Sequence, residues 1–359
     1  MTVNTVSPNI LHDNNFNFMR IVAASMVIIT HSLVLTGEGC DVDILYRMSN
    51  GEIMISTLGL RIFFVISGLL IMQSMDRSNT RIEFIWKRML RIFPGLIVCV
   101  LFAIFVIGPI FTNKTVTEYF RLESTWSYLI NLSLFKTQET LPTVFDSNMV
   151  SVVNGSIWTL AYEFSYYIMV LGLSIVGIFK RKCLVFVVFF IFFVIQLITV
   201  YCQVPPKYFY FLIYTDLKLN HFSDFGLFFI SGMIAYLYRD KIKYHNKIAL
   251  LAFVLYSICI FFNIPWLMKY VALPYLIMYV GYLSISPRIS MWGKNGDFSY
   301  GIYIYGMIVQ QSIIALLSVP INPYVLSVLS LIAVFPFAWL SWNLIEKHAL
   351  KLKYKVANR

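Results

Sequence analysis

The chain has 359 residues, of which 59% are hydrophobic and only 13% are charged. A soluble protein carries about a quarter charged residues, so this composition excludes a soluble globular protein and indicates an integral membrane protein. The net charge of +11 does not indicate nucleic-acid binding, because the chain has no basic arm or aromatic-basic module, and lysine and arginine gather in the cytoplasmic loops of membrane proteins.

The first apolar segment predicts a retained membrane helix rather than a cleaved secretory signal. A polar stretch precedes it, the apolar run is too long for a signal peptide, and no small-x-small cleavage site follows. The five cysteines are scattered, without a CxxC or a metal-ligand spacing, so we expect no metal site. The sequence leaves open whether a disulfide joins Cys40 and Cys202 on the outer side.

Apolar runs bounded by charges or by Pro, Gly and Asn predict one membrane domain over residues 1–359, an all-α bundle of about ten transmembrane helices without an appended soluble domain. The aromatic run Tyr208–Tyr214 is too short to span and predicts an interfacial or re-entrant piece. The ten predicted spans are residues 16–36, 53–73, 92–111, 157–179, 184–201, 221–238, 248–264, 266–285, 298–318 and 324–345.

Loop charges predict that both termini are cytoplasmic. The loop after the first span is acidic, whereas the loop after the second holds five basic residues between Arg77 and Arg91. Basic clusters recur after the fourth, sixth and eighth spans and in the C-terminal tail, so every even-numbered loop is basic, as the positive-inside rule requires. The longest outer loop, 112–156, contains aromatic residues that suit stacking on a sugar, but a lid that merely covers the bundle is an equal alternative.

Three ionisable residues lie well inside the predicted spans: His31, Arg61 and Glu163. Counting along each helix places all three between the outer interface and the midplane. They could form a charge cluster that only ties helices together. Alternatively, Glu163 could accept a hydrogen bond from one ring nitrogen of His31, so that the other nitrogen takes a proton from a hydroxyl.

A second polar group lies at the predicted cytoplasmic side. Arg20 opens the first span, and Arg88 and Arg91 are three residues apart on one helix face before Pro94. Guanidinium groups suit phosphate, although anchoring to lipid headgroups explains the same pattern. In the second span, Ser67-Gly68 allows a helix or a ligand to approach the backbone closely.

Taken in order, these stretches resemble the acyltransferase 3 family of bacterial membrane acyltransferases. The family's Arg-to-His pattern in the first helix matches Arg20 and His31 in NNFNFMRIVAASMVIITHS, and its FFxxSG element matches FFVISGLLI from Phe63. Its basic element matches Arg88-Met-Leu-Arg91-Ile-Phe-Pro94. Its S-x-W-[ST]-L-x-x-E element matches the stretch from Ser156 to Glu163, and SYGIYI and LIEKHALKLK resemble the closing helices.

The resemblance implies an O-acyltransferase of the bacterial inner membrane that holds no cofactor. It would take an acyl group from cytoplasmic acyl-CoA, usually acetyl-CoA, and pass it to a hydroxyl of a surface polysaccharide or its lipid-linked precursor. It also implies His31 and Glu163 as catalytic residues. Arg20, Arg88 and Arg91 would bind the donor, and Arg61, Ser67, Gly68, Ser156 and Trp158 would line or support the site.

Two positions depart from the family pattern: Gly306 stands where many members have His, and Arg61 stands where many have Asp or a small residue. Arg61 serves this protein's own substrate or pairs with Glu163. The chain would act alone or with a partner protein on the outer side. The alternative function is a proton-coupled transporter or flippase that uses His31 and Glu163 as a proton relay.

Overall fold

The computed structural model describes residues 14–201, 215–262, 268–283, 296–317 and 319–353. In these ranges its regular elements are all helical, and an isolated bridge joins Thr112 and Val144. The predicted all-α class is therefore confirmed for the described part of the chain. The aromatic run at 208–214 and Cys202 lie outside the described residues, and Cys40 is a free thiol.

Each of the ten predicted segments contains a helix, but only seven described helices are long and apolar enough to cross a membrane. Those seven are α1, α3, α4 with its extension, α8, α9, α14 and α15. The count of ten spans therefore stays a prediction. The helices are α1 (Phe16–Leu35), α3 (Ile55–Asp76), α4 (Arg81–Phe102), α8 (Trp158–Val176), α9 (Leu184–Tyr201), α10 (Leu219–Leu237), α11 (Asn246–Phe262), α12 (Lys269–Tyr282), α14 (Ser299–Leu317) and α15 (Pro323–Ser341).

Helix α4 begins eleven residues before the predicted start of the third span. The Thr80 side chain accepts a hydrogen bond from the Glu83 backbone at 3.1 Å, and Glu83 pairs with Lys87 one turn later at 2.6 Å. These capping and i,i+4 contacts extend the helix into the charged stretch. The helix runs past Pro94 and, through the π-helical segment η3 (Ala103–Ile107), into α5 (Gly108–Phe111). Arg88 and Arg91 therefore lie within a helix.

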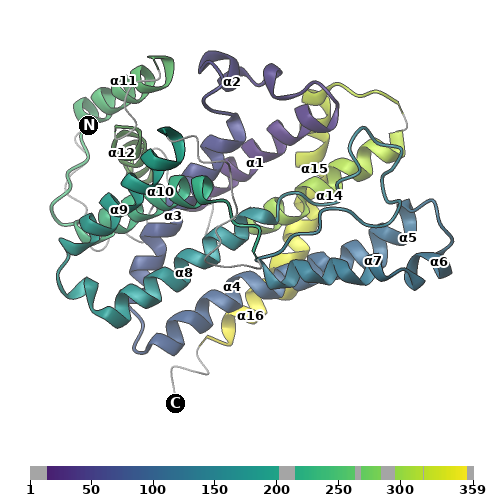
Figure 1. The fold of residues 1–359 in the computed structure, drawn as a ribbon, viewed down its shortest axis with the longest axis horizontal. Coiled ribbons are helices and arrows are strands. Elements are labelled where there is room, and N and C mark those ends of the chain that lie inside the picture. The colour runs from purple at the N-terminus through teal and green to yellow at the C-terminus, as the bar shows by residue number, and fades with distance from the viewer. Residues whose placement is uncertain (1–13, 202–214, 263–267, 284–295, 318, 354–359) are drawn as a thin grey trace.

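Helix α3 packs against α1 and α10 (Figure 1). Its contact with α10 is backbone to backbone: a Cβ on Gly68 would lie 1.9 Å from the Phe229 carbonyl oxygen, and a Cβ on Gly232 would lie 2.0 Å from the Val65 carbonyl oxygen. Small residues permit such close helix contacts in membrane proteins. Gly68 therefore serves helix packing.

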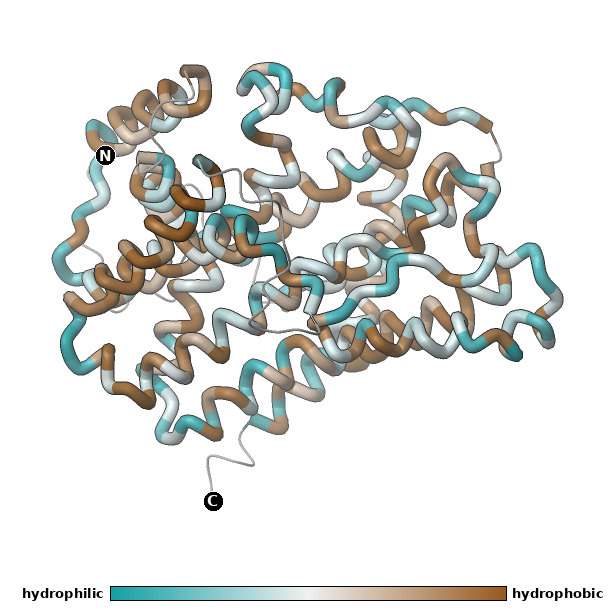
Figure 2. Tube along the Cα trace, viewed as in Figure 1, coloured by the Kyte–Doolittle hydropathy of each residue, from teal (hydrophilic) through white to brown (hydrophobic). Residues whose placement is uncertain are grey.

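Apolar residues cover much of the outside of the bundle, as expected for a surface in lipid. Figure 2 shows hydrophobic colour along most helices and hydrophilic colour in the connections. Large side chains on three outer helices are well exposed: Phe190 of α9 is 63% exposed, Leu250 of α11 65% and Ile332 of α15 67%. Such a surface would be costly in water and is suited to acyl chains.

The long loop after α5 folds into a compact cover rather than an open strand. It contains α6 (Val116–Arg121), α7 (Glu123–Trp126) and the 3-10 segment η4 (Ser127–Ser133) before an irregular stretch that leads into α8. Three aromatic side chains of the loop itself are almost fully buried: Tyr119, Tyr128 and Phe145. The remaining short elements are η2 (Cys40–Val42), α2 (Ile44–Met48), η5 (Ile178–Lys180), η8 (Trp342–Glu346) and α16 (Lys347–Lys351).

Candidate active site

A small cavity between α1, α3, α8 and α14, here called the donor cavity, brings together residues from four of the predicted motifs. Arg20, Ser67, Glu163, Thr159, Ser299 and Tyr303 are among the residues that line it. Its volume is about 40 Å³, which is room for little more than water, so a larger ligand must open it.

Glu163 is held in this cavity by two hydroxyl groups. Ser67 Oγ donates to Glu163 Oε1 at 2.9 Å, and Tyr167 OH donates to the same oxygen at 2.5 Å. Tyr167 lies one turn later on α8, whereas Ser67 comes from α3. A carboxylate with fixed donors on one oxygen keeps its second oxygen available for another group.

Two of the three arginines predicted to bind the donor are already paired with one carboxylate. Asp297 Oδ2, just before α14, accepts from both Arg20 Nη1 of α1 and Arg91 Nη2 of α4. Arg91 Nη1 also reaches Glu346 Oε2 at 3.3 Å. These ion pairs join elements that are far apart in sequence, and the side chains involved are 2–17% exposed.

Asp297 is itself fixed by the start of α14. Ser299 donates to Asp297 Oδ1 from its hydroxyl at 2.5 Å and from its backbone nitrogen at 3.2 Å. Burial raises the pKa of the Asp297 carboxyl, but the neighbouring Arg20 and Arg91 charges outweigh burial and lower that pKa to about 2. Asp297 is therefore a stable anion between two guanidinium groups.

Arg88 differs from Arg20 and Arg91. It makes no ion pair within the described residues, its guanidinium carbon lies 6.0 Å from the centre of the Tyr167 ring, and its Nε is buried without a hydrogen-bond partner. An unpaired guanidinium donor in a buried position is costly unless a ligand satisfies it. Of the three arginines, Arg88 is thus the one whose charge and donors are available to an anion.

His31 lies on the same side of α1 as Arg20, about 16 Å further along the helix. Its neighbours in sequence define its direction. Ser56 N of α3 donates to Thr30 Oγ1 at 2.9 Å, and Gln310 Nε2 of α14 donates to Ser32 Oγ at 2.7 Å. His31 is about 100° from each of these residues around the helix, so it points between α3 and α14. It is half-buried.

The expected hydrogen bond between His31 and Glu163 is absent. Glu163 lines the donor cavity with Arg20, at the opposite end of α1 from His31. Counting residues from each helix end placed the two side chains at one depth, but it could not account for how the helices cross. His31 makes no hydrogen bond or ion pair with any described residue.

Arg61 pairs with α10 rather than with Glu163. Its Nη2 lies 3.5 Å from Asp224 Oδ2, its guanidinium carbon lies 5.1 Å from the Phe228 ring centre, and the residue is 4% exposed. Tyr270 OH of α12 donates to the other Asp224 oxygen at 2.5 Å. The interpretation of Arg61 as a partner of Glu163 is therefore wrong, and this network lies outside the donor cavity.

Three further expected site residues fall in different places. Ser156 is 2% exposed, and its hydroxyl has no hydrogen-bond partner among the described residues. Trp158 is half-buried and lines a separate cleft on the predicted outer side. Gly68 packs against α10 and is not among the residues that line the donor cavity. From the FFVISG element, Phe63, Phe64 and Ser67 contribute to that cavity.

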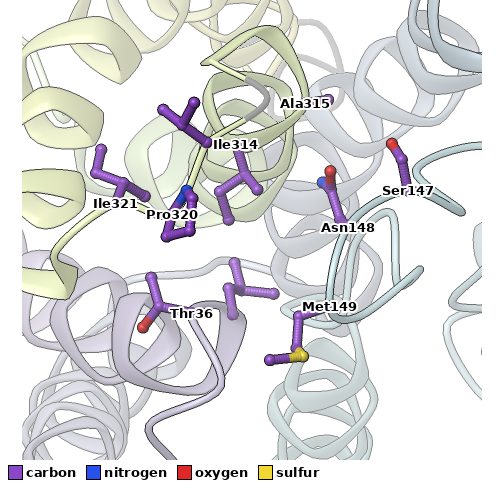
Figure 3. A pocket seen from close by; sticks show the side chains of 10 residues that line it. Thr36, Ser147, Asn148, Met149, Ile314, Ala315, Pro320 and Ile321 are labelled. Carbon is purple, nitrogen blue, oxygen red and sulfur yellow. The ribbon is translucent and has the colours of Figure 1, made fainter.

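Another cavity, here called the end cavity, lies one helical turn beyond His31 (Figure 3). It occupies about 470 Å³ where the ends of α1 and α14 meet the loop at residues 147–149. Leu35, the last residue of α1, is among its lining residues. Figure 3 labels Thr36, directly after α1, Asn148 and Met149 of the loop and Ile314 of α14 in the same lining.

The acidic partners Asp297 and Glu346 were not predicted as site residues. Both lie at or beside stretches that resemble the closing helices of the family. Asp297 lies two residues before SYGIYI, and Glu346 lies within LIEKHALKLK. An acidic residue beside an apolar span was the available signal, because such residues rarely remain unpaired at a membrane helix. Among the described residues, no group of three or more His, Cys, Asp or Glu could hold a metal ion.

Comparison of the sequence with known proteins places the chain in a family. No solved structure matches the chain. The chain is 29% identical over 350 residues to a protein named O-acetyl transferase from Shigella phage Sf6, covering 95% of this chain and 97% of the relative. It is 27% identical over 371 residues to Nodulation protein 10 of Rhizobium leguminosarum bv. viciae, covering 97% and 96%. A model described as an acyltransferase domain, that of the acyltransferase 3 family, matches residues 13–343, and the chain therefore belongs to this family of acyltransferases.

Proposed function

We propose that this acyltransferase takes an acetyl group from cytoplasmic acetyl-CoA and transfers it to a hydroxyl of a surface polysaccharide or its lipid-linked precursor in the bacterial inner membrane. One observation carries the proposal: Arg20, Arg88, Arg91 and Glu163 converge at one end of the helix that bears His31 at its other end. The name of the phage relative supports acetyl as the transferred group.

On the donor side, the arginines bind the phosphate groups of CoA. Arg88 offers an unpaired guanidinium group, whereas Arg20 and Arg91 are held in place by Asp297. Fixed guanidinium groups bind phosphate with less loss of side-chain freedom than free ones. Glu163, held by Ser67 and Tyr167, bounds the cavity through which the pantetheine arm would extend along α1.

At the other end, His31 acts as the general base. Its ring nitrogen takes the proton of the acceptor hydroxyl while the hydroxyl oxygen attacks the thioester carbonyl carbon. A carbon–oxygen bond forms, the carbon–sulfur bond breaks, and the thiolate of CoA receives the proton from His31. No described residue is hydrogen-bonded to His31, so both ring nitrogens are free for substrate.

Replacement of His31 tests this role. We expect His31→Ala to abolish O-acetylation while membrane insertion and CoA binding stay unchanged, because α1 keeps its apolar contacts. His348→Ala is the matched control, since His348 is exposed in α16. The measurement is the O-acetyl signal of surface polysaccharide by NMR in cells that make each variant. Normal O-acetylation in the His31→Ala cells would overturn the mechanism, and transport of a glycan without acetyl-CoA consumption would favour a flippase.

A further inference from the structure

The cleft that Trp158 lines is larger than both the donor cavity and the end cavity, and is here called the outer cleft. It occupies about 770 Å³ between the loop at residues 134–140, one face of α8 and the start of α10. Its lining includes Trp158 and Tyr162 of α8, Gln138 and Glu139 of the loop, Asp216 of the segment before α10, and His221 of α10. Its lining is thus both aromatic and polar.

Hydrogen bonds fix the two walls of this cleft. Asp216 Oδ2 accepts from the Thr137 backbone nitrogen at 2.8 Å, and Asp216 N donates to the Phe135 carbonyl oxygen at 2.8 Å. On the other side, Val153 N donates to the Glu139 carbonyl oxygen at 2.7 Å, which ties the loop to the segment before α8. Walls fixed in advance reduce the entropy lost when a ligand binds.

Two groups in the cleft suit a carbohydrate. The half-buried Trp158 lines the cleft, and an indole ring can stack on the C–H surface of a sugar ring. The exposed Glu139 carboxylate makes no hydrogen bond or ion pair with another described residue, so it is free to accept hydrogen bonds from sugar hydroxyls.

The outer cleft meets the donor cavity across a thin aromatic wall. Phe225 of α10 stacks on Phe64 of α3, with ring centres 4.6 Å apart, and also on His221, with ring centres 5.7 Å apart. Phe64 lines the donor cavity, whereas His221 lines the outer cleft. The two spaces therefore lie on either side of α8 and this pair of rings.

The end cavity is less suited to a sugar. Most of its lining is aliphatic, and it has no aromatic residue among those that line it. Two of its polar groups are already engaged: Thr36 Oγ1 donates to the Ser32 carbonyl oxygen at 2.9 Å, and Asn148 Nδ2 donates to Gln311 Oε1 at 2.8 Å.

We propose that the outer cleft binds a sugar residue of the acceptor glycan, with the Trp158 ring as its stacking surface and the Glu139 carboxylate as an acceptor for its hydroxyl groups. This assignment rests on the proposed O-acetyltransferase function and adds the place where the acceptor is held. The acceptor would approach from the predicted outer side, while acetyl-CoA enters at the arginine side.

Steady-state kinetics with the full-length protein in detergent test the assignment. The acceptor is surface polysaccharide from the source cells, de-O-acetylated with mild alkali, and the donor is isotopically labelled acetyl-CoA. We expect Trp158→Ala to raise the KM for polysaccharide about tenfold and Glu139→Gln to raise it about threefold. The KM for acetyl-CoA should change less than about twofold in both variants, because neither residue lines the donor cavity.

Matched variants separate sugar binding from folding. Trp158→Phe keeps an aromatic surface and should restore most of the polysaccharide affinity. Trp126→Ala and Glu123→Gln remove an exposed indole and an exposed carboxylate from the same loop region outside the cleft, and should leave both KM values unchanged.

The outcomes distinguish this assignment from the proposed function. If the wild-type protein acetylates the polysaccharide and both Trp158→Ala and Glu139→Gln keep the wild-type polysaccharide KM, the assignment of the outer cleft is overturned. If the wild-type protein consumes acetyl-CoA without acetylating the polysaccharide, the proposed acceptor class fails instead.

Discussion

Three arginines that share one expected role differ in their neighbours. Arg20 and Arg91 are each paired with Asp297, and Arg91 also with Glu346, whereas Arg88 has no acidic partner within the described residues. Removing one member of a largely buried ion-pair network leaves the remaining charges uncompensated, which costs more than removing an unpaired charge. The three side chains should therefore respond differently to the same substitution.

We expect Arg88→Ala to raise the KM for acetyl-CoA about tenfold with little change in the free energy of unfolding, because only the ligand satisfies this guanidinium group. Arg91→Ala should raise that KM less and also destabilise the protein, because Asp297 and Glu346 lose their shared partner. Initial rates and thermal unfolding in detergent measure both effects. Arg81→Ala on the exposed start of α4 is the control, and equal unfolding temperatures for Arg88→Ala and Arg91→Ala would contradict this division of roles.

Asp297 predicts an acid-sensitive contribution to stability. Its pKa is lowered from 3.8 to about 2, so its ion pairs stabilise the fold fully above about pH 4 and lose their effect as the pH falls toward 2. The contribution amounts to about 2 kcal/mol at most. Unfolding temperatures between about pH 6 and about pH 2 measure it. Asp297→Asn should flatten this part of the pH profile, and an unchanged profile would show that the carboxylate contributes nothing.

At the scale of residues, the sequence predicted which side chains carry charge at the donor end but not how they pair. Arg20, Arg88 and Arg91 follow from their positions at predicted span ends. Their counter-ions do not, because Asp297 and Glu346 are separated from Arg91 by more than two hundred residues. Which carboxylate reaches which guanidinium group depends on how α1, α4, α14 and α15 pack, and no local pattern encodes that.

Among the elements, α3 and α10 make the closest contact. Gly68 and Gly232 face the partner helix at positions where the nearest atoms are backbone carbonyl oxygens, which cannot move aside as a side chain can. Gly68→Ala should therefore force the two helices apart and destabilise the protein by about 1–3 kcal/mol. Thermal unfolding followed by size-exclusion chromatography measures the loss.

Gly172→Ala provides a matched control for this substitution. Gly172 lies in α8, where an added Cβ would meet nothing within 4 Å, so the change should be neutral or slightly stabilising. If both alanine variants unfold at the same temperature, close packing of α3 on α10 does not determine stability. Loss of activity in Gly68→Ala without loss of stability would instead point to a ligand beside Gly68.

The positions of helices along the sequence could be predicted from apolar runs, but the depths of individual side chains in the bundle could not. Each predicted segment contains a helix because its hydrophobic residues are continuous enough to cover a membrane helix. The predicted start of the third span was late by eleven residues, since the capping of α4 by Thr80 extends the helix into a charged stretch. The alternative in which Glu163 hydrogen-bonds to His31 is not seen in the structure, for a related reason: helix crossing shifts residues that a count from the helix ends places side by side.

At the scale of the whole molecule, the number of spans depends on α10, α11 and α12. Helix α11 is only 17 residues long and α12 only 14, so length alone does not qualify them as spans. Helix α10 carries Asp224, which lowers its hydropathy but is neutralised by Arg61 of α3. Because charges that are paired inside a bundle cost less than charges facing lipid, α10 can cross the membrane despite its sequence.

Cysteine labelling distinguishes ten spans from seven. If α10, α11 and α12 all cross, the connection between α14 and α15 is external and the segment after α15 is cytoplasmic. If none of the three crosses, both assignments reverse.

In a variant without the native cysteines, Val319→Cys and Lys351→Cys place single thiols at exposed positions on either side of α15. With ten spans, a membrane-impermeant maleimide should label Val319→Cys in intact cells, and should label Lys351→Cys only after permeabilisation. The reverse pattern would contradict the ten-span topology, and with it the separation of an inner donor side from an outer acceptor side.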